Sequence, residues 1–206
     1  MHAPVALLGR GSFMNSPVKF AVFFGIAALV IGLIAGSAGG GLSKTNLGAD
    51  VKVPTDQTRF TAAITSARAS YQSAANELAA GGVRRVRQKA ICDAVINQRV
   101  SDWVGKITTL TSSGDGHGVI SIAVGPFIQI STWYNSFSDG RANTLIDPGS
   151  PLFKTLMKMK VGDTVKFSGR FFASTTDCVD EQSFTLQGSM SLPVFTLRFS
   201  SIQKLS

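Results

Sequence analysis

An uncharged, strongly apolar segment near the start of the chain constrains its architecture more than any other feature. Residues 20–42 contain no Asp, Glu, Lys or Arg, and large apolar side chains dominate the segment as far as Ala35. A helix needs about 20 such residues to cross the hydrocarbon core of a bilayer, where each backbone polar group must be paired. Because a buried helix of a soluble domain would normally show a polar face, the segment predicts one transmembrane helix.

A cleaved signal peptide is the alternative interpretation of the same residues. Ala35, Ser37 and Ala38 are small side chains of the kind found at a cleavage site after a shorter apolar core. Against cleavage, residues 1–19 are a long segment to precede the apolar run of a leader. We therefore expect a retained anchor, preceded by an N-terminal tail (1–19) and followed by a linker (43–55).

The charges that flank the segment give a weak prediction of its orientation. Arg10, Lys19 and the amino terminus lie before it, and Lys44 and Lys52 lie after it. This slight bias favours a cytoplasmic N-terminus. In a Gram-negative bacterium, that orientation predicts a single-pass protein of the inner membrane whose C-terminal domain lies in the periplasm.

Three glycines at intervals of four raise the question of helix pairing in the membrane. Gly32, Gly36 and Gly40 have the spacing that lets two membrane helices approach closely, as in a homo-oligomer. The alternative is that these glycines mark the end of the helix and the start of a flexible linker.

Composition narrows the classes of partner. The chain has 206 residues and a formal net charge of +8, which favours nucleic acid, anionic lipid headgroups or acidic proteins. Cys92 and Cys178, with the only histidines, His2 and His117, lack the spacing of a zinc site, so we expect no metal and no cofactor. The two cysteines form either a disulfide, in an oxidising compartment, or two buried free thiols.

A helical segment is expected at residues 56–97. Its first apolar positions alternate at steps of four and three: Phe60, Ile64, Ala67, Tyr71, Ala74 and Leu78. Such a stripe predicts either docking on the side of a barrel or a coiled coil, and we favour docking because the stripe is short and contains two alanines. Gly81 and Gly82 predict the end of the first helix.

A second helix is expected from about residue 83 to 97. Its inward positions would be Val86, Ala90, Ile91 and Val95. The segment 83–89 concentrates four positive charges. It is either a contact for lipid headgroups or phosphate or a solvated helix face, and we favour the solvated face.

Residues 100–205 change to the pattern of a β-rich domain. Strands are expected at 102–110, 119–124, 127–134, 163–173 and 193–202, with a helix at 151–160 and a short hairpin arm at 184–189. The order strand–strand–strand–helix–strand–strand is that of a five-stranded OB-type barrel. The predicted fold class is therefore α+β, with an N-terminal transmembrane helix, amphipathic helices and an OB-like β-barrel.

Three short sequence motifs are similar to those of a known group of proteins: WVGKI at 103–107, GDTVKFSG at 162–169 and FTLRFSSI at 195–202. They resemble bacterial membrane-anchored proteins with an OB domain of the tRNA-anticodon-binding-like type. The resemblance covers about half of the chain, residues 100–205. It implies the fold but no activity, because this fold hosts unrelated functions. We expect a non-enzymatic, membrane-tethered binding or scaffold protein that contacts another envelope protein, peptidoglycan or lipid.

Strand phase predicts a basic binding surface. In the first, fourth and fifth expected strands, aromatic and apolar residues occupy the phase that would fill the barrel. The opposite phase carries Lys106, Lys166, Arg170 and Arg198. Because these three strands are neighbours in an OB barrel, we expect the four side chains to form one basic wall.

Single-stranded nucleic acid, bound at the cytoplasmic face of the membrane, is the alternative function. OB proteins bind such strands on the wall of the second and third strands, where bases stack on exposed rings above a basic groove. That wall would show Val119, Ser121, Ala123, Phe127, Gln129, Ser131 and Trp133, of which Phe127 and Trp133 carry rings that can stack on bases. No Lys or Arg accompanies them on these strands, so we do not favour this alternative.

The remaining polar motifs predict turns rather than chemistry. The GDGHG sequence at 114–118 precedes a strand instead of the helix that a phosphate-binding loop needs, and predicts a hairpin turn with an exposed His117. Asp177, Asp180 and Glu181 lack the spacing of a calcium loop and predict a solvated turn. No nucleophile, base and acid are evident by spacing, so no catalytic residue is assigned.

Overall fold

The structure is a computed structural model that describes residues 51–140 and 142–205. The predicted tail (1–19), the predicted membrane segment (20–42) with its three spaced glycines, and most of the linker (43–55) lie outside the described residues. In the part of the chain that is described, no helix is both long enough and apolar enough to cross a membrane.

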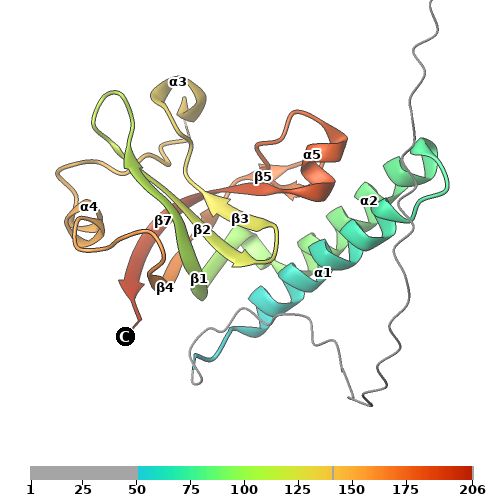
Figure 1. Cartoon of the computed structure of the whole chain (residues 1–206), viewed down its shortest axis with the longest axis horizontal. Coiled ribbons are helices and arrows are strands. Elements are labelled where there is room, and N and C mark those ends of the chain that lie inside the picture. Colours follow the sequence, from blue (N-terminus) through green and yellow to red (C-terminus); the bar gives the residue numbers. More distant parts are fainter. Residues whose placement is uncertain (1–50, 141, 206) are drawn as a thin grey trace, which may run out of the picture. The chain divides into compact units, whose positions relative to one another are not determined.

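Five strands close into a barrel, which confirms the predicted α+β class and its five-stranded β-barrel (Figure 1). In chain order they are β1 (Arg99–Ser112), β2 (Gly118–Gly125), β3 (Ile128–Ser131), β4 (Thr164–Phe171) and β7 (Val194–Lys204). Around the barrel the order is β1-β2-β3-β7-β4, and β4 pairs with β1 to close it. All neighbours are antiparallel except β3 and β7, which are parallel.

Alternation along the strands places the aromatic phase inside the barrel, as predicted. Trp103, Phe167, Phe171 and Phe195 are fully buried. The ring of Trp103 meets those of Phe167 and Phe171 edge to face, with centroids 6.4 and 5.8 Å apart. Such pairs contribute about 0.5–1.5 kcal/mol each beyond the burial of their area. This aromatic core fixes which faces of β1, β4 and β7 point outward.

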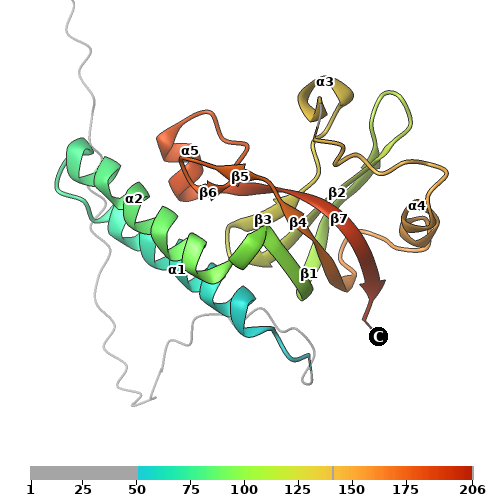
Figure 2. The same ribbon diagram turned by 180° about the vertical axis from the view of Figure 1, so that it is seen from behind.

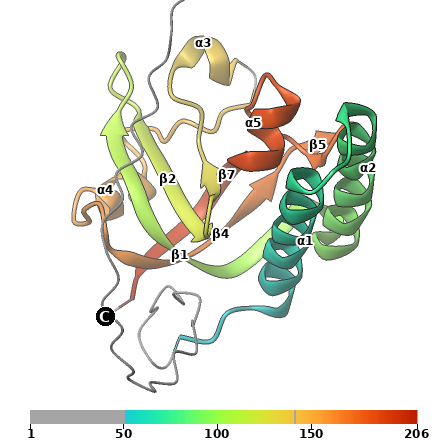
Figure 3. The same ribbon diagram turned by 45° about the vertical axis from the view of Figure 1, so that its right-hand side comes forward.

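Two helices, α1 (Thr55–Gln72) and α2 (Glu77–Ala94), pack side by side across one end of the barrel (Figures 1 and 3). Phe60 of α1 reaches into the aromatic core, with its ring centroid 5.1 Å from that of Trp103 and 5.0 Å from that of Phe195. The first helix therefore docks on the barrel, as predicted, but across one end of it rather than along its side.

The break between these helices lies earlier than predicted. The side chain of Asn76 caps α2 by accepting a hydrogen bond of 2.9 Å from the third residue of the helix, so Gly81 and Gly82 lie inside α2. The expectation that these glycines end a helix is wrong, because a strong cap precedes them and a glycine inside a helix costs only about 1 kcal/mol. The buried face of α2 also differs from the predicted one, since Val86 is exposed and Arg87 is buried.

The apolar stripes are otherwise partly as predicted. Ile91 and Val95 are buried, whereas Leu78 is exposed. Leu78 was expected as the last position of the first stripe, but it belongs to the first turn of α2 and points away from the barrel's core residues. A periodic pattern that is extended across an unrecognised cap therefore loses its phase.

Shorter elements decorate the barrel: α3 (Ser136–Asp139), α4 (Pro151–Leu156), β5 (Ala173–Ser174), β6 (Cys178–Val179), α5 (Leu186–Ser191) and a single 3-10 turn (Ile96–Gln98). Figure 2 shows β6 and α5 on the side of the barrel next to the helix pair. The helix expected at 151–160 forms over its first part only, because α4 ends at Leu156. The hairpin arm expected at 184–189 is wrong, because Thr185 caps α5 by accepting from the N–H of Gly188 at 3.0 Å.

Candidate functional site

Three arginines from three neighbouring strands line up on the outside of the barrel. Arg99 of β1 lies opposite Arg170 of β4, and Arg170 lies opposite Arg198 of β7. Directly opposed residues of antiparallel strands point to the same face, with Cβ atoms about 4.5–5.5 Å apart. All three side chains are exposed. We call Arg99, Arg170 and Arg198 the arginine row.

The positive charge of the arginine row is not balanced within residues 51–140 and 142–205, where no Asp or Glu forms an ion pair with it. Arg198 donates from Nε to the carbonyl of Ala142 at 3.0 Å and lies over the ring of Phe172, 5.3 Å from its centroid. Neither contact removes its charge. Because like charges opposite each other on neighbouring strands are destabilising, a bound anion would stabilise this face of the barrel.

Two shallow hollows adjoin the arginine row and share Arg170 and Arg198. One has a volume of about 280 Å³ and is lined by Arg99, Val100, Ser101, Ser168, Gly169, Arg170, Arg198, Phe199 and Ser200. The other has a volume of about 270 Å³ and is lined by Gln98, Arg170, Phe171, Phe172, Ala173 and Arg198. Hydroxyl and amide donors beside guanidinium groups suit carboxylate or phosphate oxygens. Neither lining contains an acid or a histidine, so the arrangement is suited to binding anions rather than to acid–base chemistry.

A close approach of β4 to β7 sets the geometry of the arginine row. At Gly169 a Cβ atom would lie 2.5 Å from the carbonyl oxygen of Arg198 and 2.9 Å from the side chain of Leu197. Only glycine permits this approach. The pairing of the two strands shifts between Ser168 and Gly169, and beyond this bulge Arg170 faces Arg198.

The four residues of the predicted basic wall do not form one compact patch. The structure brings Arg170 and Arg198 together. Lys166 is on the same outward face but forms an ion pair with Asp102 at 3.5 Å. Lys106 pairs with the first residue of β4, so it lies about six residues, or roughly 20 Å, along the strand from Arg170.

Strand phase alone does not reveal Arg99, which completes the row, or Gln98, which lines the second hollow. The first strand was expected to begin at residue 102, but β1 begins at Arg99. The pairing of β1 with β4 shifts between Val100 and Trp103, and Asp102 has a positive φ of 56°. This bulge interrupts the alternation that would otherwise have extended the strand to Arg99.

The wall of β2 and β3 is not the exposed surface that the sequence predicts. Val119, Ser121 and Ser131 are fully buried. The chain that follows β3 folds back over this wall, where the Tyr134 hydroxyl lies 3.2 Å from Oγ of Ser121. A covering of this kind comes from a loop, so the phase of the strands cannot predict it.

The two rings expected to stack bases are not free platforms. Phe127 is 56% exposed, but the guanidinium of Arg68 lies 3.8 Å from the centre of its ring. Trp133 is half-buried, and its backbone N–H donates to Oγ1 of Thr144 at 2.8 Å. A base at Phe127 would have to use the opposite face of the ring or displace Arg68.

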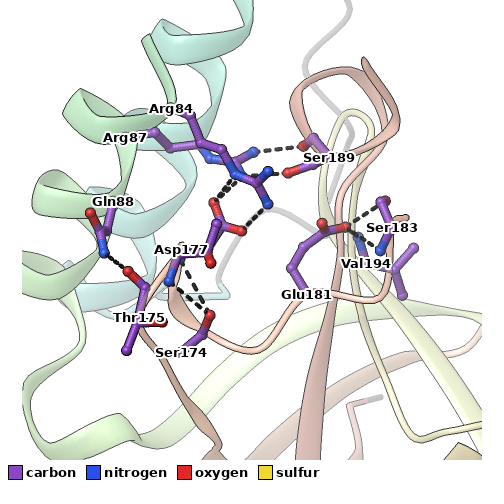
Figure 4. A network of polar contacts seen from close by, with 11 residues as sticks. Arg84, Arg87, Gln88, Ser174, Thr175, Asp177, Glu181, Ser183, Ser189 and Val194 are labelled. Atoms are coloured by element: carbon purple, nitrogen blue, oxygen red, sulfur yellow. Dashed lines mark hydrogen bonds and ion pairs between the residues drawn. The ribbon is translucent and has the colours of Figure 1, made fainter. Parts of the chain in front are cut away.

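A second group of charges joins α2 to the barrel (Figure 4). Arg84 and Arg87 both bind Asp177, with Nη2 of Arg84 2.5 Å from Oδ2 and Nη2 of Arg87 2.6 Å from Oδ1. Arg87 also donates to the carbonyl of Ser189 at 2.6 Å. We call Arg84, Arg87 and Asp177 the buried ion cluster. The expected solvated helix face and solvated turn are wrong here, because Arg87 and Asp177 are 1% and 2% exposed.

The buried ion cluster is charged, and its carboxylate is bonded by both arginines, although Nε of Arg87 has no hydrogen-bond partner among the described residues. Burial alone would raise the pKa of Asp177, but hydrogen bonds from Arg84 and Arg87 outweigh it and hold the pKa below its ordinary value. The hydrogen bond to Asp177 likewise raises the pKa of Arg84. The cluster carries one net positive charge, but Arg87 and Asp177 are enclosed by the protein, so the cluster serves the fold rather than an outside ligand.

A disulfide lies beside the buried ion cluster. The sequence left open whether Cys92 and Cys178 are bonded or free, and the structure joins them, with Cα atoms 5.5 Å apart. The bond links α2 to β6. Glu181, also expected in a solvated turn, accepts from the hydroxyl of Ser183 at 2.7 Å and from the N–H of Val194 at 3.0 Å (Figure 4). These hydrogen bonds hold the segment between β6 and β7 against the start of β7.

The turn 114–118 is a hairpin turn between β1 and β2, as predicted. Nδ1 of His117 lies 3.3 Å from Oδ1 of Asp115, which accepts hydrogen bonds from the hydroxyls of Ser113 and Ser136. Those hydroxyls hold the pKa of Asp115 well below its usual range. Because both serines donate to the carboxylate and neither is bonded to the imidazole of His117, neither is placed as an activated nucleophile. Across the described ranges, no three His, Cys, Asp or Glu side chains are grouped to hold a metal.

Comparison with known proteins assigns no role to these residues. No protein-family model and no curated protein matches this chain. The arginine row therefore stands as the candidate site on its exposure, its unbalanced charge and its neighbouring hydroxyl donors.

Proposed function

We propose that this chain is a non-enzymatic binding protein of the bacterial cell envelope, whose barrel binds an acidic segment of another protein. The arginine row is the observation that carries the proposal. Guanidinium groups bind carboxylates through two parallel hydrogen bonds, which a lysine cannot do. The row spans two strand spacings, about 10 Å, and so fits a short run of acidic side chains better than a single small anion.

The proposed location is the periplasm, with residues 20–42 as a single-pass anchor in the inner membrane. The length and apolar character of that segment support the anchor. The disulfide between Cys92 and Cys178 supports the compartment, because disulfides persist where the environment is oxidising. In this setting the barrel would hold an acidic partner close to the membrane.

We also propose that the barrel is of the OB type, similar to the tRNA-anticodon-binding-like domains of bacterial membrane-anchored proteins. The order β1-β2-β3-β7-β4 and the helix α4 between β3 and β4 support this assignment. The arginine row would then lie on the wall opposite the surface that OB proteins use for single strands.

The positions of the aromatic rings favour an acidic protein segment over nucleic acid. Single strands bind where bases can stack on exposed rings above a basic groove. Phe172, a ring beside the arginine row, is half-buried with Arg198 over it. Phe127 lies just ahead of β3, on a different part of the barrel, with Arg68 over its ring.

Binding of two labelled probes to the detergent-solubilised full chain tests the proposal. The probes are a glutamate-rich peptide and an oligothymidylate of equal charge, and fluorescence anisotropy gives both affinities. We expect the peptide to bind more tightly and Arg170→Ser to weaken it about tenfold, since a charge-assisted hydrogen bond contributes about 1.5–3 kcal/mol. Arg85→Ser, which removes an exposed arginine of α2, is the matched control and should leave the affinity unchanged.

Two results would count against this function. Equal weakening by Arg170→Ser and Arg85→Ser would mean that only net charge matters. Tighter binding of oligothymidylate, weakened by Phe127→Ala, would favour the nucleic-acid function instead. The location has a separate test, in which a periplasm-dependent reporter enzyme fused to the C-terminus should be active in cells.

A further inference from the structure

We propose that a second surface, formed around α4, docks on an anionic lipid bilayer. This inference is independent of the arginine row and goes beyond the proposed function. The surface combines two exposed apolar side chains, Met157 and Val161, with four exposed lysines that we call the lysine rim: Lys106, Lys154, Lys158 and Lys160. We call these six residues the α4 surface. It lies at the opposite end of the domain from α1 and α2 (Figures 1 and 2).

The apolar side chains of this surface are exposed. Met157 is 74% exposed and Val161 is 56% exposed. Next to Met157, a hollow of about 280 Å³ is lined mainly by apolar side chains, among them Leu110, Phe153 and Met159. Exposed apolar groups with a polar rim mark surfaces that bind a partner or a membrane.

The lysine rim is uniformly positive. Residues 151–162 contain three lysines and no Asp or Glu. The acid that follows, Asp163, is held by Lys204 at 2.9 Å. Lys106, which the sequence placed with the arginines, belongs here instead, because its Cε lies 4.0 Å from the Cβ position of Gly162. Among the described residues, none of these four lysines forms an ion pair.

The chemistry of this rim fits lipid headgroups better than a folded partner. A lysine is a mobile point charge on a long apolar stem, so it can follow phosphates that have no fixed arrangement, whereas arginine recognises carboxylates in a set geometry. Apolar side chains that enter the headgroup boundary, with lysines reaching to anionic lipids, are the known mode of interfacial binding. Each lysine near an anionic surface is expected to increase binding about fivefold.

Lysine acetylation of the full chain, reconstituted in vesicles, tests the inference. One set of vesicles contains phosphatidylcholine alone, and the other also contains phosphatidylglycerol. A membrane-impermeant acetylating reagent is added, and mass spectrometry gives the modification of Lys154, Lys158 and Lys160 relative to Lys89, an exposed lysine of α2. We expect this ratio to fall at least about threefold in anionic vesicles and to recover at high salt.

A matched pair of variants separates docking from other causes. Met157→Glu should abolish the protection, whereas Val86→Glu, which changes a side chain of 71% exposure on α2, should keep it. Both positions are exposed, so both variants should fold, and near-ultraviolet circular dichroism checks this. Equal labelling in the two lipids, or protection that survives Met157→Glu, would overturn the inference. Protection that grows with the protein-to-lipid ratio would assign the surface to a second copy of the chain.

Discussion

The arginine row and the buried ion cluster use the same side chain for opposite purposes. In the buried ion cluster, Arg84 and Arg87 share one carboxylate, and Arg87 is fully enclosed by the protein. In the arginine row, three guanidinium groups face solvent in one line and no described acid is paired with them. The first arrangement contains a carboxylate for its guanidinium groups, whereas the second has none among the described residues.

The comparison shows that a structural arginine is distinguished by its paired carboxylate. The count of arginines in a region does not make this distinction. A buried charge without its partner costs several kcal/mol, so Arg87 and Asp177 depend on each other for folding. An exposed arginine keeps its hydration, and removing it changes stability little. Substitutions in the two regions should therefore give effects of different size and even of different sign.

The largest effect is expected from the disulfide beside the buried ion cluster. Cys92 and Cys178 are separated by 86 residues. In the chain-entropy model the double change Cys92→Ser and Cys178→Ser lowers the free energy of unfolding by about 4 kcal/mol. Urea unfolding of the detergent-solubilised full chain, followed by the near-ultraviolet signal of buried Trp103, measures it. Reduction of the unmodified chain should match the double variant, and equal midpoints with and without reductant would contradict the prediction.

Breaking the buried ion cluster should have the next largest effect. Arg87→Met keeps the length and packing of the side chain but leaves Asp177 with a single partner, so we expect a loss of about 3 kcal/mol in the free energy of unfolding. The control is Arg85→Met, at an exposed position two residues earlier in the same helix, with an expected change within about 0.5 kcal/mol. Similar losses from both substitutions would show that helix propensity, not the ion cluster, is responsible.

The buried ion cluster also predicts a dependence of stability on acid. Because the pKa of Asp177 is lowered in the folded chain, its contribution is present above the ordinary pKa of Asp, about 3.9, and is lost as the pH falls through the lower folded value. Asp177→Asn should be less stable than the unmodified chain at pH 7, and the difference should shrink at about pH 3. Urea midpoints of both proteins at the two pH values check this. A difference that stays constant would argue against ionised Asp177 in the fold.

The smallest effect is expected in the arginine row, and it should have the opposite sign. Arg170 has a like charge opposite it on each neighbouring strand, so Arg170→Ser should raise the free energy of unfolding by roughly 0.5 kcal/mol at low salt. The gain should disappear at high salt, where exposed charges are screened. Thermal unfolding at two salt concentrations is the measurement. A marked loss of stability would place the arginine row with the buried ion cluster as part of the structure.

The same two regions show what could be predicted from the sequence. The alternation of Phe167 and Phe171 with Lys166 and Arg170 predicts which face of β4 fills the barrel, because period-two burial is a local property. Arg99 is missed because a bulge interrupts that period. Strand phase therefore predicts the direction of a side chain only within a stretch of strand that contains no bulge.

The buried ion cluster could not be predicted for a different reason. Arg87 and Asp177 are 90 residues apart, and neither residue alone shows that it will be buried. Val86 was expected inside and Arg87 outside because apolar side chains are usually buried and charged ones exposed, but the structure shows the reverse. Pairing across this distance depends on the packing of α2 against β6, which no local pattern contains.

The closure of the barrel by β4 against β1 gives each of its five strands two neighbours. β1 pairs with β4 only as far as Lys106 and with β2 only from Lys106 onward, so each half of this long strand has one edge without a strand partner. Gln57 of α1 occupies part of that edge by bonding both the N–H and the carbonyl of Val104. An added strand, the route by which exposed edges recruit extended peptides and aggregate, would have to displace such contacts.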